Sequence, residues 1–455
     1  MKTFYDIHTH ILNLSHPNLT AYLFRPDLKQ QLAQLLKDNR FDLAKLGLGS
    51  LILPSLTKNA IHEKLMKGEK ALINVIVNCL SFMEVPMEYQ FLVLEYFLKT
   101  GSPTLLNKQR QLEINGTAYD KIVLCPLVID FGYKNMSSGI FYGLSPKRPI
   151  ASQVGDLLYA IKTYYRFNLE VKEKRMHLSK EIPDFQACKH EKLFEIYPFM
   201  GLDTRNYTLK EIRGLLYKYF PNFSKSESGE ERRARLFAKM GQLDSNMYKS
   251  PEEYADVFAG IKLYPQLGFD PYPKDPDELK KVQYLYKFCV KRRIPITTHC
   301  SDGGYKIGQY DDLTRPPPTG RWKNVLNEFP ELTLNFAHFG SESQSPKRQW
   351  RNAIIALTKK HPHVYADISC NEATPAYYNE LESLFNPTPK PKFDYPPPDN
   401  NPELYTRVLF GSDFSINLLA SKVASYNAYL DAFAKAKLSH KDALCSENPA
   451  RFLFG

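Results

Sequence analysis

Short apolar runs, each ending in a polar side chain that can bind a metal or titrate, recur along this sequence. The runs and the side chains that follow them are residues 3–7 with His8, residues 294–298 with His299, residues 332–337 with His338, and residues 407–412 with Asp413. A fifth run, residues 260–264, carries Lys262 inside it. Because barrels of parallel strands place their active sites at the C-terminal strand ends, this placement predicts an α/β fold of the (β/α)8 kind.

The pair His8 and His10 lies in the segment Asp6-Ile7-His8-Thr9-His10. Alternate residues of a strand face the same side, so the two imidazoles are expected to lie close enough to hold one cation. Neutral imidazole is a good ligand for zinc, iron, nickel or manganese ions. Taken alone, the pair could also lie on a surface without a metal, and other strand ends must supply the rest of a site.

The expected strands and loops follow the same pattern along the chain. The strands are residues 3–8, 121–130, 195–201, 259–263, 295–299, 332–337, 364–368 and 408–411. A helical pattern at about 277–291 lies between the fourth and fifth strands, as the crossover between parallel strands requires. The proline-rich segments 315–318, 386–391 and 396–398 are stiff and are expected to form lids or subunit contacts, which leaves a homo-oligomer open.

The ordered motifs resemble those of the amidohydrolase superfamily, most closely its amidohydrolase-related branch of metal-dependent hydrolases and non-oxidative decarboxylases. The segments that carry the resemblance are residues 6–10, 198–205, 260–265, 295–299, 321–340, 411–413 and 448–455. The resemblance implies a single TIM-barrel domain over residues 1–455. Its helical insertions, at about 11–118, 132–192 and 206–250, would cap the C-terminal mouth of the barrel.

The resemblance also implies a ligand set. His8, His10 and His299 would bind a divalent metal, with zinc as the expected ion, and Asp413 would complete the set or lie beside it. In this superfamily the Asp acts as general base on the water that the metal activates, because a cation lowers the pKa of water toward ~7. In isolation, Asp413 would more simply cap the helix that follows it.

The roles of His338 and Lys262 depend on the number of ions. His338 could bind a second metal or polarise the carbonyl group of the substrate. In binuclear members of the superfamily a Lys on the fourth strand carries a carbamate that bridges two metals, and burial would favour the neutral amine that carbamylation needs. The alternative for Lys262 is an ammonium paired with a carboxylate in the barrel mouth. We expect one ion, with two as the alternative.

Substrate contacts are expected from Arg205, Arg315 and Tyr264. Either arginine could clamp a carboxylate with two hydrogen bonds, although an arginine that anchors the cap or lies on the surface would fit the sequence equally well. The expected activity is metal-dependent hydrolysis of a C–N or C–O bond in a small amide, lactone or cyclic amide. The alternatives are non-oxidative decarboxylation of an aromatic or unsaturated acid and, third, a barrel without catalysis.

Composition narrows the class of protein. The net charge of +11 is spread along the chain and no nucleic-acid-binding module accompanies it, so we expect no nucleic-acid partner and at most an attraction for an anionic substrate. The seven cysteines form no C-x-x-C pair. The start lacks the apolar region of a signal peptide, and glutamates interrupt the apolar stretch 71–97. These features predict a cytoplasmic enzyme without a membrane segment.

Overall fold

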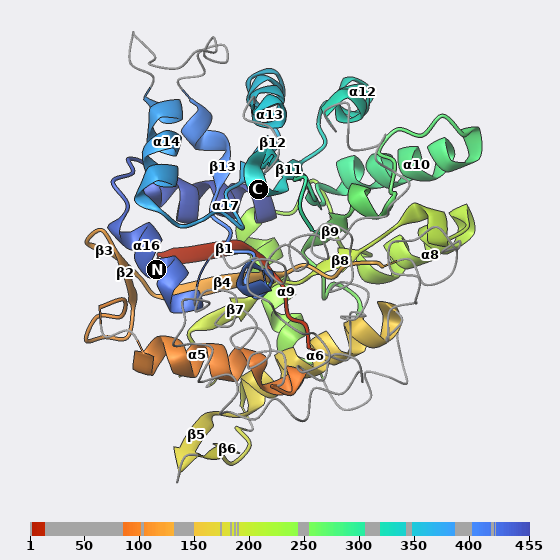
Figure 1. Cartoon of the computed structure of the whole chain (residues 1–455). Coiled ribbons are helices and arrows are strands. Elements are labelled where there is room, and N and C mark those ends of the chain that lie inside the picture. Colours follow the sequence, from red (N-terminus) through yellow and green to blue (C-terminus); the bar gives the residue numbers. More distant parts are fainter. Residues whose placement is uncertain are drawn as a thin grey trace, which may run out of the picture.

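The computed structural model describes residues 2–13, 85–101, 104–131, 150–172, 175–182, 184–185, 188, 191–243, 254–304, 319–342, 348–386, 403–419, 423 and 425–455. Most of the predicted insertion at 11–118, the first part of the insertion at 132–192, and Arg315 lie outside these residues. In the described part of the chain, parallel strands at the centre are surrounded by helices (Figure 1).

The central strands divide between two parallel sheets, with the orders β1-β4-β7 and β13-β12-β11-β10-β9-β8. The first sheet contains β1 (Thr3–Thr9), β4 (Lys121–Pro126) and β7 (Phe194–Ile196). The second contains β8 (Phe199–Gly201), β9 (Gly260–Leu263), β10 (Ile296–Thr298), β11 (Leu334–Phe336), β12 (Val364–Asp367) and β13 (Val408–Leu409). Each strand overlaps one of the predicted strands, and β7 and β8 divide the predicted strand at 195–201 between them.

Backbone hydrogen bonds connect the two sheets on both sides. On one side, the amide of Val128 after β4 donates to Phe199 O of β8 at 3.1 Å. On the other side, Ile7 of β1 donates to Phe410 O at 3.2 Å, and the amide of Asp413 donates to His8 O at 2.7 Å. The predicted α/β class with parallel strands is therefore confirmed, although the strands are assigned to two sheets and not to one closed barrel.

The helices of the second sheet follow the strands in alternation, as parallel connections require. They are α10 (Pro276–Arg292), α12 (Thr319–Glu328), α13 (Gln349–Lys360), α14 (Pro375–Phe385), α15 (Ile416–Leu419), α16 (Tyr426–Lys435) and α17 (Asn448–Phe454). The predicted helix at 277–291 is α10, whose first turn is capped by the side chain of Asp275.

The earlier helices and two hairpins precede β9 in the chain (Figure 1). The helices are α5 (Gln90–Gly101), α6 (Ile150–Arg166), α8 (Leu209–Tyr219) and α9 (Gly229–Gly241). The hairpins are β2 (Leu112–Ile114) with β3 (Thr117–Tyr119), and β5 (Leu169–Lys172) with β6 (Arg175–Leu178). Capping boxes begin α8 at Thr208 and α9 at Ser228. None of the described helices is both long and apolar enough to span a bilayer.

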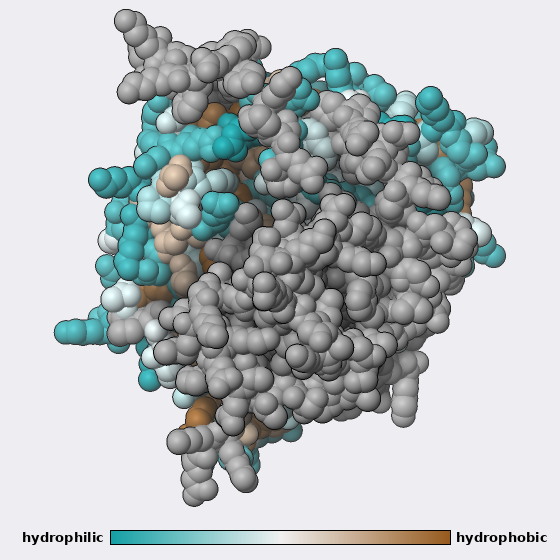
Figure 2. Space-filling view, viewed as in Figure 1, coloured by the Kyte–Doolittle hydropathy of each residue, from teal (hydrophilic) through white to brown (hydrophobic). Residues whose placement is uncertain are grey.

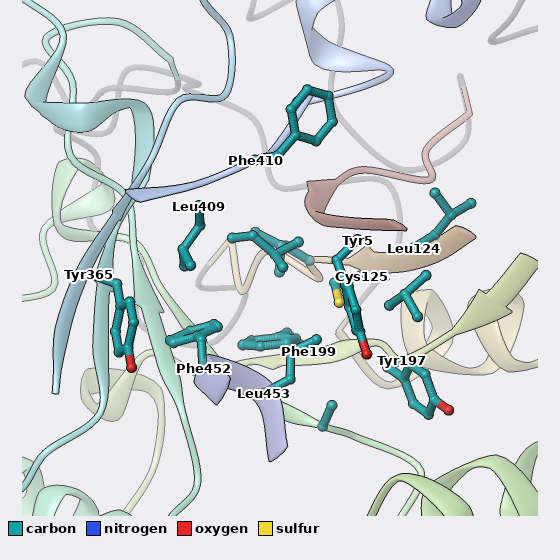
Figure 3. Packing of buried hydrophobic residues seen from close by; sticks show 14 of the residues in the cluster. Tyr5, Leu124, Cys125, Tyr197, Phe199, Tyr365, Leu409, Phe410, Phe452 and Leu453 are labelled. Atoms are coloured by element: carbon teal, nitrogen blue, oxygen red, sulfur yellow. The ribbon is translucent and has the colours of Figure 1, made fainter. Parts of the chain in front are cut away.

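The apolar core lies between the strands and α17 (Figure 3). The ring of Phe452 from α17 lies 5.5 Å from that of Tyr365 on β12 and 6.3 Å from that of Phe199 on β8. Each buried side chain of this size contributes about 1.5–3 kcal/mol to folding, so the core holds the strands in place beneath the site. On the face shown in Figure 2, the described surface residues are mostly hydrophilic.

Candidate metal centre

Three side chains meet where β1 ends and where the segment after β13 begins. His8 Nε2 and His10 Nε2 each lie 3.2 Å from Asp413 Oδ1. All three side chains are buried. We call His8, His10 and Asp413 the carboxylate corner. The predicted ligands from the two most distant motifs of the sequence are therefore brought together.

The local backbone explains this meeting. The register between β1 and β4 shifts between Asp6 and Thr9, and Phe4 on the regular part of β1 packs against Phe433 of α16. Beyond the shift, His8 and His10 turn toward Asp413. The carboxylate of Asp6 accepts hydrogen bonds from the amides of Ser412, at 2.9 Å, and His8, at 3.3 Å, which fixes β1 against the segment that carries Asp413.

The hydrogen-bond pattern of His10 shows that this corner suits a cation. His10 Nδ1 lies 2.8 Å from the carbonyl oxygen of Leu127, which can only accept, so Nδ1 carries the proton. Burial lowers the pKa of His10, and the neutral ring then has a lone pair at Nε2. That lone pair faces Asp413 Oδ1. Two acceptors at 3.2 Å repel each other unless a proton or a metal ion lies between them.

Asp413 and His8 complete the charge pattern of this corner. Burial opposes ionisation of Asp413, but His10 and His8 outweigh it and hold the pKa of Asp413 well below its usual range. His8 Nδ1 lies 3.1 Å from Asp367 Oδ2, and among the described residues His8 Nε2 has no hydrogen-bond partner. Burial and Lys262 oppose protonation of His8, yet the two carboxylates raise its pKa. A metal bound at Nε2 of His8 would replace the proton that the raised pKa favours on that atom.

His299 and His338 form a second group, next to the first. His338 Nε2 lies 3.2 Å from His299 Nδ1, and the ring of His338 lies 4.9 Å from that of His8. Burial lowers the pKa of both residues, that of His338 to about 4. Tyr264 stacks on His299 with the ring centroids 4.2 Å apart. Both imidazoles are thus neutral near pH 7 and can act as ligands.

Lys262 lies on β9 and is 1% exposed, and its amine has no hydrogen-bond partner in the part of the chain that the structure describes. Burial lowers its pKa to about 8, against the opposing influence of Asp367 and Asp413. A share of the amine is therefore neutral near that pH. We call His299, His338 and Lys262 the amine corner.

The residues present fit a divalent ion better in the carboxylate corner than in the amine corner. The carboxylate corner offers two imidazole nitrogens and a carboxylate oxygen within 4.8 Å of one another, a donor set suited to zinc. A second set within that distance combines His8, His338 and Asp367. His299 belongs to neither set in the described chain.

Arg205 is held by its own neighbours. It makes a bidentate ion pair with Asp203, with Nη2 2.6 Å from Oδ2 and Nε 3.0 Å from Oδ1, and it donates to Leu267 O at 2.6 Å. The contacts hold Arg205 against Asp203 and Leu267, and its role in binding a substrate carboxylate stays a prediction. Of the other predicted substrate contacts, Tyr264 lies on His299.

Two buried residues of the site were not singled out in the sequence, namely Asp367 at the end of β12 and Ser369 just after it. The signal was present, because Val364-Tyr365-Ala366-Asp367 is another apolar run that ends in a carboxylate. Asp367 contacts His8 Nδ1, and Ser369 Oγ lies within 3.0 Å of Nδ1 of both His8 and His338.

Comparison with known proteins supports the class that the motifs indicated. Residues 231–455 match the model of a family described as amidohydrolase. This match confirms the resemblance of the chain to the amidohydrolase superfamily. The matched region contains Lys262, His299, His338 and Asp413, whereas His8 and His10 precede it. None of the curated proteins compared with the chain matches it.

Several solved structures share a low overall similarity with the chain. Amidohydrolase 2 from Bifidobacterium longum subsp. infantis is 14% identical with a TM-score of 0.28, and the alignment covers 44% of this chain and 62% of that one. A probable 2-pyrone-4,6-dicarboxylic acid hydrolase from Acinetobacter baumannii is 13% identical, with a TM-score of 0.38 and coverages of 74% and 84%. A 2,6-dihydroxybenzoate decarboxylase from Rhizobium is 10% identical, with a TM-score of 0.33 and coverages of 78% and 94%.

Proposed function

We propose that this chain is a metal-dependent hydrolase that cleaves a C–N or C–O bond in a small amide, lactone or cyclic amide. The observation that carries the proposal is the carboxylate corner, where imidazole nitrogens and an ionised carboxylate oxygen face one another at 3.2 Å without a proton to share at His10. A divalent ion bound between these groups would satisfy the carboxylate and both imidazole nitrogens.

The proposal includes the fold. If β7 and β8 are two parts of one bent strand, the hydrogen bonds at Val128 and Ile7 connect eight strands into a ring. We therefore propose a (β/α)8 barrel with helical insertions over its mouth. His8 lies near the C-terminal end of β1, and His299, His338 and Asp413 follow the C-terminal ends of β10, β11 and β13, which is where barrel active sites lie.

The roles of the residues follow from their contacts. His8, His10 and Asp413 would hold the ion, and His299 would lie beside it as a further ligand. A divalent ion such as zinc would supply an activated water and polarise the bond to be cleaved. Asp413 is anionic, so it can accept a proton from the attacking water and deliver it to the leaving group. Tyr264, stacked on His299, would line the substrate pocket.

Decarboxylation of an aromatic or unsaturated acid is the second candidate, because the same ligands can hold the single ion that this reaction needs. One ion is what the carboxylate corner favours. A Lys262-bridged pair of ions would instead strengthen the case for hydrolysis, so the count of bound ions helps to separate the two reactions.

The test is metal analysis of protein purified without chelator, followed by a panel of lactones, N-acyl compounds and aromatic acids. We expect one divalent ion per wild-type chain and none in the double variant His8→Ala/His10→Ala. A control that removes two exposed imidazoles, His177→Ala/His363→Ala, should keep the ion. Full metal content in the His8/His10 variant would contradict the proposal. Release of CO2 from an acid, with no hydrolysis in the panel, would assign the second candidate.

A further inference from the structure

Ser369 lies between two histidines that come from different strands. Its hydroxyl oxygen is 3.0 Å from Nδ1 of His8 and 2.9 Å from Nδ1 of His338. The side chain is buried, and its hydroxyl also donates to Asp367 Oδ1. One hydroxyl therefore contacts a residue of the carboxylate corner and a residue of the amine corner.

The single proton of this hydroxyl determines what it can do for the two rings. The Asp367 carboxylate is surrounded by donors, since Oδ1 accepts from the His338 amide at 3.0 Å and Oδ2 accepts from Asn335 Nδ2 at 2.7 Å. An ionised carboxylate has no proton to give, so the hydroxyl proton of Ser369 points to Asp367. Its lone pairs are then left for the two imidazoles.

Both imidazoles must consequently carry a proton on Nδ1. Independent contacts agree with this assignment. Nδ1 of His8 also faces Asp367 Oδ2 at 3.1 Å, and Nδ1 of His338 also faces the carbonyl oxygen of Ser369 at 3.3 Å. Each of these oxygens can only accept. A neutral imidazole that is protonated on Nδ1 has its lone pair on Nε2.

We propose that Ser369 is a positioning residue that keeps the proton on Nδ1 of both His8 and His338, so that Nε2 of each ring is the atom available to the site. The proposal rests on the proposed function, because the metal is what uses Nε2 of His8. Hydrogen-bond partners of this kind orient metal-ligating histidines and fix their tautomer. Ser369 itself would contact neither metal nor substrate.

The assignment also changes the role expected for His338. Polarising a carbonyl group through Nε2 would need a proton on that atom, and the neutral ring has none there. Its Nε2 lone pair faces His299 Nδ1 at 3.2 Å. His338 is thus set to accept a proton or a cation.

The first measurement needs no metal. Imidazole nitrogens are labelled with 15N, and two-bond 15N–1H correlations in metal-free protein report which nitrogen carries the proton. The signals of His8 and His338 are identified by His8→Gln and His338→Gln. We expect Nδ1–H on both rings of the wild type, and a shift of His338 toward the Nε2–H form in Ser369→Ala. Ser369→Thr, which keeps the hydroxyl, should restore the wild-type pattern.

The second measurement is Zn²⁺ affinity by competition with a chelator. Loss of such a hydrogen-bond partner typically weakens metal binding about 10–100-fold, and we expect this for Ser369→Ala but not for Ser369→Thr. Ser446→Ala is the matched control, because it removes a buried hydroxyl whose partner, Thr3 O at 2.7 Å, lies away from the site. If Ser369→Ala does not fold, Ser369→Cys replaces it, since a thiol is a poor acceptor.

Unchanged Nδ1–H tautomers in Ser369→Ala would overturn the proposal. An equal loss of Zn²⁺ affinity in Ser446→Ala would overturn it as well, because the effect would then reflect general destabilisation. A wild-type chain that binds no Zn²⁺ would instead contradict the proposed function, while the tautomers of the metal-free protein would still decide the role of Ser369.

Discussion

The carboxylate corner and the amine corner lie side by side and contain charged side chains of opposite sign, Asp413 in the first and Lys262 in the second, although each charge also influences histidines of the other corner. His8 and His10 share an ionised carboxylate, Asp413. His299 and His338 have the buried amine of Lys262 near them. A divalent ion is stabilised by the first arrangement and repelled by an ammonium in the second. The number of ions that such a site holds therefore depends on the charged side chains next to the histidines and not on the histidines alone.

The largest effect should come from removing the charge of the carboxylate corner. In Asp413→Asn the amide oxygen can still contact an ion but cannot take up a proton near neutral pH. We expect turnover to fall by about 10²–10⁴-fold, the usual contribution of a general base, while circular dichroism shows an intact fold. Steady-state kinetics on an active compound from the panel measures this. A rate like that of the wild type would remove Asp413 from the mechanism.

A change in the amine corner should leave the metal content as it is. Lys262→Met removes a buried amine that lacks a hydrogen bond. Since an unpaired buried polar group costs about 1–3 kcal/mol, we expect the metal-free variant to be more stable by that order in urea unfolding. Metal analysis should still find one ion per chain. Loss of one of two ions would show that Lys262 bridges a pair, and the difference between the corners would disappear.

The stability of the metal-free protein should also separate the two corners through its dependence on pH. Burial lowers the pKa of His338 to about 4, so between about pH 6.5 and 4 the unfolded chain binds a proton that the folded chain does not. The metal-free protein should therefore lose up to about 3 kcal/mol through His338 as the pH falls across that window. The raised pKa of His8 acts in the opposite direction. Its contribution is present below the unfolded pKa and is lost as the pH rises through the folded pKa.

Urea unfolding of metal-free protein at several pH values tests these signs. His338→Gln should reduce the loss of stability at low pH, and His8→Gln should increase it relative to the wild type. Equal pH dependence in both variants would mean that the two histidines share one electrostatic environment, contrary to the comparison.

The sequence predicted the strands well because each parallel strand is a short apolar run, buried on both sides, with a polar residue at its end. It predicted His8, His10 and Asp413 as neighbours only through resemblance to a family. The local pattern alone would have placed Asp6 and His8 on the same side of a regular strand. The register shift between Asp6 and Thr9, which depends on pairing with β4, was not readable from residues 3–10.

Other parts of the site could not be read locally either. Whether Lys262 and Arg205 face a partner depends on which side chains the fold brings near them. Arg205 pairs with Asp203 two residues away, whereas the amine of Lys262 lies over the ring of Tyr264 and has no hydrogen-bond partner among the described residues. Asp367 carries the same signal as the other strand ends but lies outside the segments that carry the resemblance to the family. The role of Ser369 depends on two rings that lie far from it in the chain, which no local pattern contains.

The amide of Asp413 donates to the carbonyl oxygen of His8, and this contact joins segments some four hundred residues apart. Because contacts between distant segments slow folding, we expect the ligands of the carboxylate corner to meet late in folding. An ion bound there would stabilise the contact between β1 and the segment that carries Asp413, because a ligand that binds only the folded state stabilises that state. Metal binding would then occur only once the chain has folded. Removing the ion with a chelator should destabilise the contact between β1 and the Asp413 segment before the rest of the protein.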